Sequence, residues 1–103
     1  FRVAANGAVS LVVNEAANPA VKSPNGLLAD GPGRLLVVDF ASGELLRLTL
    51  ASGATEKLAD GFGGGDGLAR DAAGMLYISD WKGGKVWKLA LGQPGAKPVL
   101  YPL

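Results

Sequence analysis

The chain repeats itself with a period of roughly 41 residues, which is the spacing of arrays built from one supersecondary unit. Residues 25–50 (NGLLADGPGRLLVVDFASGELLRLTL) align without a gap with residues 66–91 (DGLARDAAGMLYISDWKGGKVWKLAL), and nine of the 26 aligned pairs are identical. Chance would give about two identities at ordinary residue frequencies. The repeat therefore constrains the fold more than any single motif does.

Each repeat contains four short apolar segments separated by turn residues. Gly, Pro, Asn and Asp fill the breaks, and the third segment of the first copy alternates Leu with Arg and Thr. This pattern predicts four antiparallel strands per repeat. The predicted strands are residues 26–29, 34–40, 44–50 and 54–59 in the first copy, and 68–70, 75–81, 85–91 and 97–103 in the second.

The N-terminal residues look like the end of an earlier copy. The stretch FRVAANGAVSLVV contains two short apolar runs joined by Asn6-Gly7, a dipeptide typical of a tight hairpin turn. We therefore divide the chain into residues 1–24, the last two strands of a preceding unit with a connecting loop, and two further units at residues 25–65 and 66–103.

Four antiparallel strands in each unit predict an all-β fold of β-propeller blades. A helical solenoid of similar period is disfavoured, because no window of the chain shows an apolar period of 3.6 residues. A propeller ring closes with roughly four to eight blades. The chain therefore supplies an incomplete ring, and we expect other copies or missing blades to cover its apolar faces and strand edges.

Composition limits the chemistry of any site. The chain has no His and no Cys, so a site must use Asp, Glu, Asn and backbone oxygens. The ten basic and nine acidic residues are spread without a run, and no nucleic-acid partner is expected. The longest apolar run, Leu35–Val38, is far shorter than the ~20 residues that span a bilayer. We expect a soluble protein, of either the cytoplasm or a periplasmic or secreted location.

Two elements at equivalent repeat positions resemble a known family. SPNGLLAD, followed by RLLVVDFASGELLRL, and GDGLARD, followed by MLYISDWKGGKVWKL, look like consecutive blades of the senescence marker protein/gluconolactonase/regucalcin-like family. Its members are six-bladed, calcium-dependent propellers related in architecture to NHL-repeat proteins. The resemblance implies that Asn25 and Asp66 bind one divalent metal in the central channel, and that Asp66 also transfers a proton. The Pro that usually precedes this Asp is replaced by Gly65, and the remaining ligands should come from preceding blades.

The resemblance implies a divalent-metal-dependent hydrolase acting on a small lactone or ester. The cofactor would be Ca²⁺ or another divalent ion such as Zn²⁺, Mn²⁺ or Mg²⁺, and carboxylate and amide oxygens suit a hard cation. Phe62 is a candidate wall of the substrate pocket, with loop packing as its alternative. We expect the isolated chain to be a weak or inactive enzyme, because two ligands in an open ring do not form a preorganised site.

Two other functions remain open at this stage. One is a non-catalytic, NHL-like propeller module that binds a ligand or a protein, and the other is an assembly fragment that retains a relic of the family site. Several residues also have structural interpretations. Asn25 and Asp66 could make turns before Gly, Asp39 and Asp80 fit hairpin turns, Asp30 and Asp71 fit turns at the opposite end without a functional role, and Phe40, Trp81 and Trp87 are expected to pack between blades.

Overall fold

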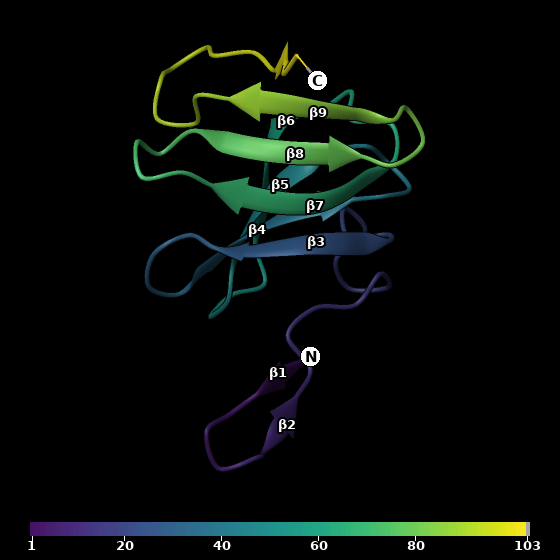
Figure 1. Ribbon diagram of the computed structural model, residues 1–103. Coiled ribbons are helices and arrows are strands. Elements are labelled where there is room, and N and C mark those ends of the chain that lie inside the picture. Colours follow the sequence, from purple (N-terminus) through teal and green to yellow (C-terminus); the bar gives the residue numbers. More distant parts are fainter. Residues whose placement is uncertain (103) are drawn as a thin grey trace.

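The computed structural model describes residues 1–102, which form β-strands and connecting loops without a helix. The strands make three antiparallel sheets (Figure 1). A small N-terminal hairpin pairs β1 (Arg2–Val3) with β2 (Val9–Ser10). The first sheet has the order β3 (Pro24–Ala29), β4 (Arg34–Asp39), β5 (Leu45–Thr49), β6 (Thr55–Ala59), and the second has β7 (Gly65–Arg70), β8 (Leu76–Asp80), β9 (Lys85–Leu89), β10 (Val99–Leu100).

The predicted all-β, antiparallel character of the chain is confirmed. Each large sheet is a meander in which every strand pairs with its neighbours in sequence, and each strand overlaps its predicted range. The last strand is shorter than predicted: β10 covers two residues of the range 97–103, and residue 103 lies outside the described part of the chain. Equivalent turns use equivalent residues. Gly43 (φ 69°) and Gly84 (φ 61°) close the hairpins that follow β4 and β8. Since positive φ is strained for residues with a Cβ, these two glycines are required by the turns themselves.

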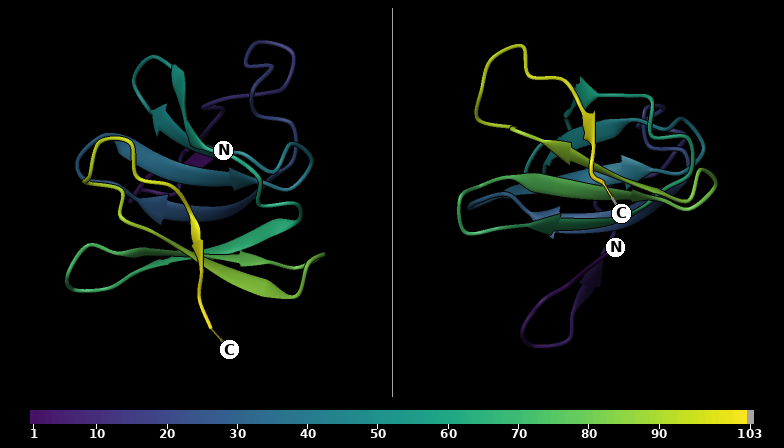
Figure 2. Two further views of the ribbon diagram at one scale, coloured as in Figure 1. Left: turned by 90° about the horizontal axis from the view of Figure 1, so that it is seen from above. Right: turned by 45° about the horizontal axis from the view of Figure 1, so that its top comes forward.

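The two large sheets stack face to face, as two layers in the view from above (Figure 2). The core between them is formed by the inner face of the first sheet, which carries Leu36, Val38 and Leu45, and the inner face of the second, which carries Leu76, Ile78 and Leu89. All six side chains are buried. Burial at roughly 25 cal/mol per Å² of apolar surface makes this shared core the main force holding the sheets together.

The other face of the first sheet, here called its outer face, has a smaller core. Val37, Leu46 and Leu48 pack there against Val21 in the connecting loop, with Val12 and Val13 alongside. Because both faces of the first sheet contact apolar side chains, β4 has four successive apolar residues instead of an alternation. The N-terminal hairpin pairs with neither large sheet and projects beyond them (Figure 1). No helix that could span a bilayer is found in residues 1–102.

Candidate functional site

Asn25 and Asp66 lie where the backbones of the two large sheets approach most closely. Their strands, β3 and β7, are the neighbouring edges of the stacked sheets. The amide Nδ2 of Asn25 donates a hydrogen bond to the carbonyl oxygen of Gly65, at 3.4 Å. A Cβ on Gly26 would collide with the carbonyl oxygen of Asp66. The backbones at these two equivalent repeat positions therefore lie against each other.

Both candidate ligands sit at an irregularity of the strand pairing. In the first sheet Pro24 pairs with Asp39 and Gly26 with Val38, so Asn25 is an extra residue on its strand. The pairing of β7 with β8 shifts in the same way between Gly65 and Leu68. Such β-bulges bend a strand and redirect a side chain. Both Asn25 and Asp66 are exposed, so their oxygens are accessible to a ligand.

Gly65 has a packing role that its sequence context does not reveal. A Cβ on this residue would collide with Cγ2 of Val38 in the first sheet. The equivalent residue in the first sheet is Pro24, which lines a groove on the outer face of that sheet. The second sheet therefore requires glycine at this position, because the valine of the neighbouring sheet fills the space of a side chain.

Phe62 lies in the core between the two sheets. Its side chain is fully buried, and its ring packs edge to face with that of Trp87 at 6.2 Å between centroids. This environment corresponds to the loop-packing alternative. The buried ring of Phe62 thus anchors the loop from Asp60 to Gly64 to the core, and it holds the backbone that leads to Asp66 in place.

Asp39 fastens the loop before β3 to the hairpin after β4. Its Oδ2 accepts hydrogen bonds from the backbone N–H groups of Lys22 and Ser23, both at 2.8 Å. Its Oδ1 accepts from Ala41 and Ser42, at 3.0 and 3.1 Å. The predicted hairpin-turn role is confirmed and extended, because the same carboxylate also holds the segment that leads to Asn25.

Asp80 repeats this arrangement in the second sheet. Its Oδ1 accepts hydrogen bonds from the backbone N–H groups of Gly64 and Gly83, at 3.0 and 2.9 Å. Burial raises the pKa of both Asp39 and Asp80, but the backbone donors outweigh it, and both pKa values lie below the ordinary aspartate value. The two carboxylates stay ionised at neutral pH and preorganise the approaches to Asn25 and Asp66.

An aromatic pair lies at the same end of the sheets. The rings of Phe40 and Trp81 are 6.3 Å apart, and Nζ of Lys82 lies 4.9 Å from the centre of the Phe40 ring. Trp81 thus contacts the first sheet through Phe40, but the expected burial between the sheets is not found, because its side chain is 72% exposed. It follows the last residue of β8, beyond the shared core. For Trp87, which packs against that core, the expectation is confirmed.

Asp30 is the residue that sequence reasoning undervalued. Its turn lies at the opposite end of β3, yet its carboxylate accepts hydrogen bonds from Nε of Arg47 at 2.8 Å and from a guanidinium nitrogen of Arg70 at 3.0 Å. Burial raises the pKa of Asp30, but the two arginines outweigh it and hold the pKa below its usual value. Arg70 belongs to the second sheet, so Asp30 links the two sheets. The spacing between Asp30 and Arg70, close to one repeat period, was the signal available in the sequence.

Asp71, the repeat equivalent of Asp30, confirms the turn interpretation. Its Oδ1 accepts hydrogen bonds from the backbone N–H groups of Ala73 and Met75, and its Oδ2 accepts one from the hydroxyl of Tyr77. The backbone bond from Met75 contributes most to a pKa below the usual aspartate value. All these partners belong to the second sheet, so equivalent aspartates serve different purposes in the two repeats.

The donor set at the candidate site consists of one carboxylate and one amide oxygen. Both are hard oxygen donors of the kind that Ca²⁺ and Mg²⁺ prefer. Within residues 1–102, no three His, Cys, Asp or Glu side chains cluster in a way that could hold a metal ion. Two donors fall short of the roughly six to eight oxygens that surround Ca²⁺. Comparison of the chain with protein-family models and with curated protein sequences finds no match.

Proposed function

We propose that the two large sheets are adjacent blades of a β-propeller and that Asn25 and Asp66 bind a divalent cation at its axis, as part of a lactone or ester hydrolase. The observation that carries this proposal is the close approach of β3 and β7 at these two residues, where Asn25 reaches the carbonyl oxygen of Gly65. Equivalent positions on successive blades point toward a common axis. An oxygen-rich pair at such positions favours a hard cation over a transition metal.

The chain's own residues have separate tasks in this function. Asn25 donates its Nδ2 to Gly65, which leaves the amide oxygen Oδ1 as the cation ligand. The Asp66 carboxylate is exposed and can accept the proton of an attacking water molecule. When bound, a divalent cation supplies Lewis-acid polarisation of the substrate carbonyl. Asp39 and Asp80 hold the loops that lead to the two ligands.

Isothermal titration with Ca²⁺ and Mg²⁺ tests the proposal. Asn25→Ala and Asp66→Asn each remove one ligand, and we expect at least a tenfold weaker apparent affinity in each variant. Asp60→Asn is the matched control: it removes an exposed carboxylate that pairs with Lys57 and is not a proposed ligand, and it should leave the affinity unchanged. Equal affinities in the wild type and in Asp66→Asn would contradict the proposed site.

A second measurement addresses catalysis. Because the described chain offers only two of the required oxygen donors, we expect the purified chain to hydrolyse lactones and esters slowly even with excess cation. The activity that is present should disappear in Asp66→Asn and persist in Asp60→Asn. Ordinary turnover that survives Asp66→Asn would show that the hydrolysis occurs elsewhere.

A further inference from the structure

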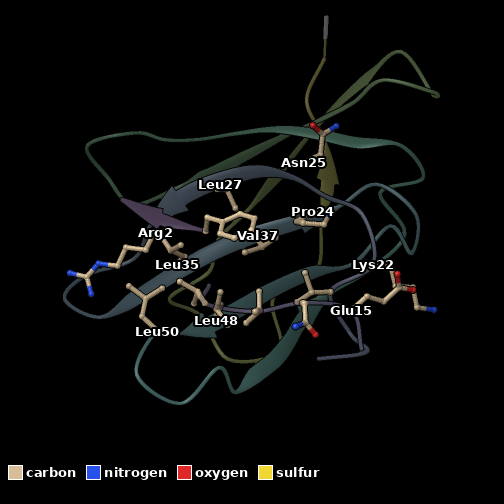
Figure 3. A pocket seen from close by; sticks show the side chains of 15 residues that line it. Arg2, Glu15, Lys22, Pro24, Asn25, Leu27, Leu35, Val37, Leu48 and Leu50 are labelled. Atoms are coloured by element: carbon tan, nitrogen blue, oxygen red, sulfur yellow. The ribbon is translucent and has the colours of Figure 1, made fainter. Parts of the chain in front are cut away.

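The outer face of the first sheet is covered only in part. A groove of about 480 Å³ lies between this face and the N-terminal segment. Leu27 lines it and is 60% exposed. Figure 3 shows the aliphatic side chains gathered in the groove, with Asn25 pointing away from them. The sheet residues that line it are Pro24, Leu27, Leu35, Val37, Leu48 and Leu50.

The second sheet shows what covers the equivalent face. Leu68, the repeat equivalent of Leu27, packs against the shared core, and Leu76, Ile78 and Leu89, the equivalents of Leu35, Val37 and Leu48, are buried in it. Their cover is the inner face of the first sheet. The chain thus contains its own template for the missing contact. The face of the second sheet that is equivalent to the outer face of the first is covered by the preceding sheet, through Leu36, Val38 and Leu45.

A candidate cover exists at the other end of the chain. The face of the second sheet that points away from the first carries Tyr77, Ser79 and Val86, the repeat equivalents of Leu36, Val38 and Leu45. The rings of Tyr77 and Tyr101 pack edge to face there, 5.7 Å apart, and Tyr101 is 44% exposed. Tyrosine is enriched at protein interfaces because it combines apolar area with a polar tip. We call this surface the tail face.

The side-chain sizes on the groove and the tail face complement each other. The two aromatic residues of the inner core, Phe62 and Trp87, correspond to the smaller Val21 and Leu46 beside the groove. The tail face has the opposite change, because Tyr77 replaces Leu36. A second pair shows the same exchange of size. Within the chain Gly65 lies against Val38 of the other sheet. Its equivalent beside the groove is the larger Pro24, and the equivalent of Val38 on the tail face is the smaller Ser79. Where the side chains beside the groove are smaller than in the inner core, those on the tail face are larger, and the reverse also holds.

Gly67 supports the same pairing. Its repeat equivalent, Gly26, must be glycine because the carbonyl oxygen of Asp66 lies against it. Around Gly67 a Cβ would meet only the hydroxyl of Ser79, a side chain of the same sheet. The second sheet thus retains the glycine that allows close backbone approach, although nothing else in residues 1–102 approaches it.

We propose that the chain associates head to tail with a second copy, whose tail face fills the groove on the first sheet. The contact does not depend on the proposed hydrolase activity. If that proposed function also holds, the same geometry sets Asn25 of one protomer beside Asp66 of the partner subunit and adds oxygen donors to the site. Two or three copies would supply four or six sheets, within the roughly four to eight that close a propeller.

The association is measured by light scattering after size-exclusion chromatography, at about 0.1 mM and with EDTA, well above a micromolar dissociation constant. Leu27→Glu disables the groove, and Tyr77→Lys disables the tail face while leaving Asp71 a partner for a hydrogen bond. We expect the wild type to have at least twice the mass of one chain, and each variant alone to be monomeric. A mixture of the two variants should form a dimer, because each retains the surface that the other lacks.

Three controls make the result decisive. Val9→Glu replaces an equally exposed apolar side chain of the N-terminal hairpin that lines neither surface, and it should leave the association unchanged. Circular dichroism checks that the variants stay folded, and Tyr101→Lys replaces Tyr77→Lys if that variant does not fold. A monomeric wild type would overturn the proposal, as would association without complementation between the variants. Because EDTA removes divalent ions, failure of the metal site leaves this result intact.

Discussion

At the scale of single residues, buried carboxylates that accept backbone hydrogen bonds control the loops around the candidate site. Each carboxylate oxygen of Asp39 accepts hydrogen bonds from two backbone N–H groups. In Asp39→Asn an amide NH₂ group, which is a donor, takes the place of one of these oxygens and leaves two N–H groups without an acceptor. We expect the free energy of unfolding to fall by about 3 kcal/mol at pH 7. Urea denaturation measures the loss, and Asp60→Asn, at an exposed ion pair, should leave stability nearly unchanged.

The pH dependence of this effect has a definite sign. Because the pKa of Asp39 is lowered on folding from 3.8, its carboxylate contributes stability that is fully present above about pH 4. That contribution is lost as the pH falls through the lower pKa of the folded state. The stability difference between the wild type and Asp39→Asn should therefore shrink between pH 4 and pH 2. A difference that stays constant over this range would contradict the ionised role of Asp39.

Gly26 gives a second prediction at the residue scale, with a control built into the repeat. In Gly26→Ala the new Cβ would collide with the carbonyl oxygen of Asp66, so the sheets must separate locally. We expect a loss of about 2 to 3 kcal/mol in the free energy of unfolding. Gly67→Ala, at the equivalent position, should cost much less and should weaken the head-to-tail association instead. Equal losses of stability in the two variants would contradict the close approach.

At the scale of elements, Asp30 joins a turn of the first sheet to the end of β7 in the second. The carboxylate is almost buried and contacts arginines from both sheets. In a double-mutant cycle with Asp30→Asn and Arg70→Gln, we expect a coupling energy of about 1 kcal/mol, measured by urea denaturation. The exposed pair Lys57–Asp60 is the comparison, and its coupling should be weaker and lost in high salt. No coupling between Asp30 and Arg70 would mean that the apolar core alone joins the sheets.

At the scale of the whole molecule, the shared core makes the two sheets one folding unit. Trp87 of the second sheet packs against residues of both sheets. In Trp81→Phe it is the only tryptophan, so its fluorescence reports on that contact. We expect its unfolding transition in urea to coincide with that of the far-ultraviolet circular dichroism signal. Separate transitions would show that the sheets unfold independently.

Much of the architecture was predictable because it depends on local and periodic information. The strands follow from alternating apolar residues and the turns from glycines at positions such as Gly43 and Gly84, which need a positive φ. The repeat also identified Asn25 and Asp66 as equivalent positions, and the structure brings their strands together. This identification needed no knowledge of side-chain contacts, because it depends only on the period of the repeat.

Only the tertiary structure decided which sheet faces pack together and which residues each contact between them needs. Asp30 and Asp71 are identical residues at equivalent positions, but only Asp30 has an arginine of the next sheet within reach. Gly65 must lack a side chain because Val38 of the neighbouring sheet fills that space. Trp81 is exposed because it lies beyond the end of the core. The sequence by itself determined strands, turns and their repetition, which are local, whereas contacts between faces depend on how two surfaces dock and so became visible only in three dimensions.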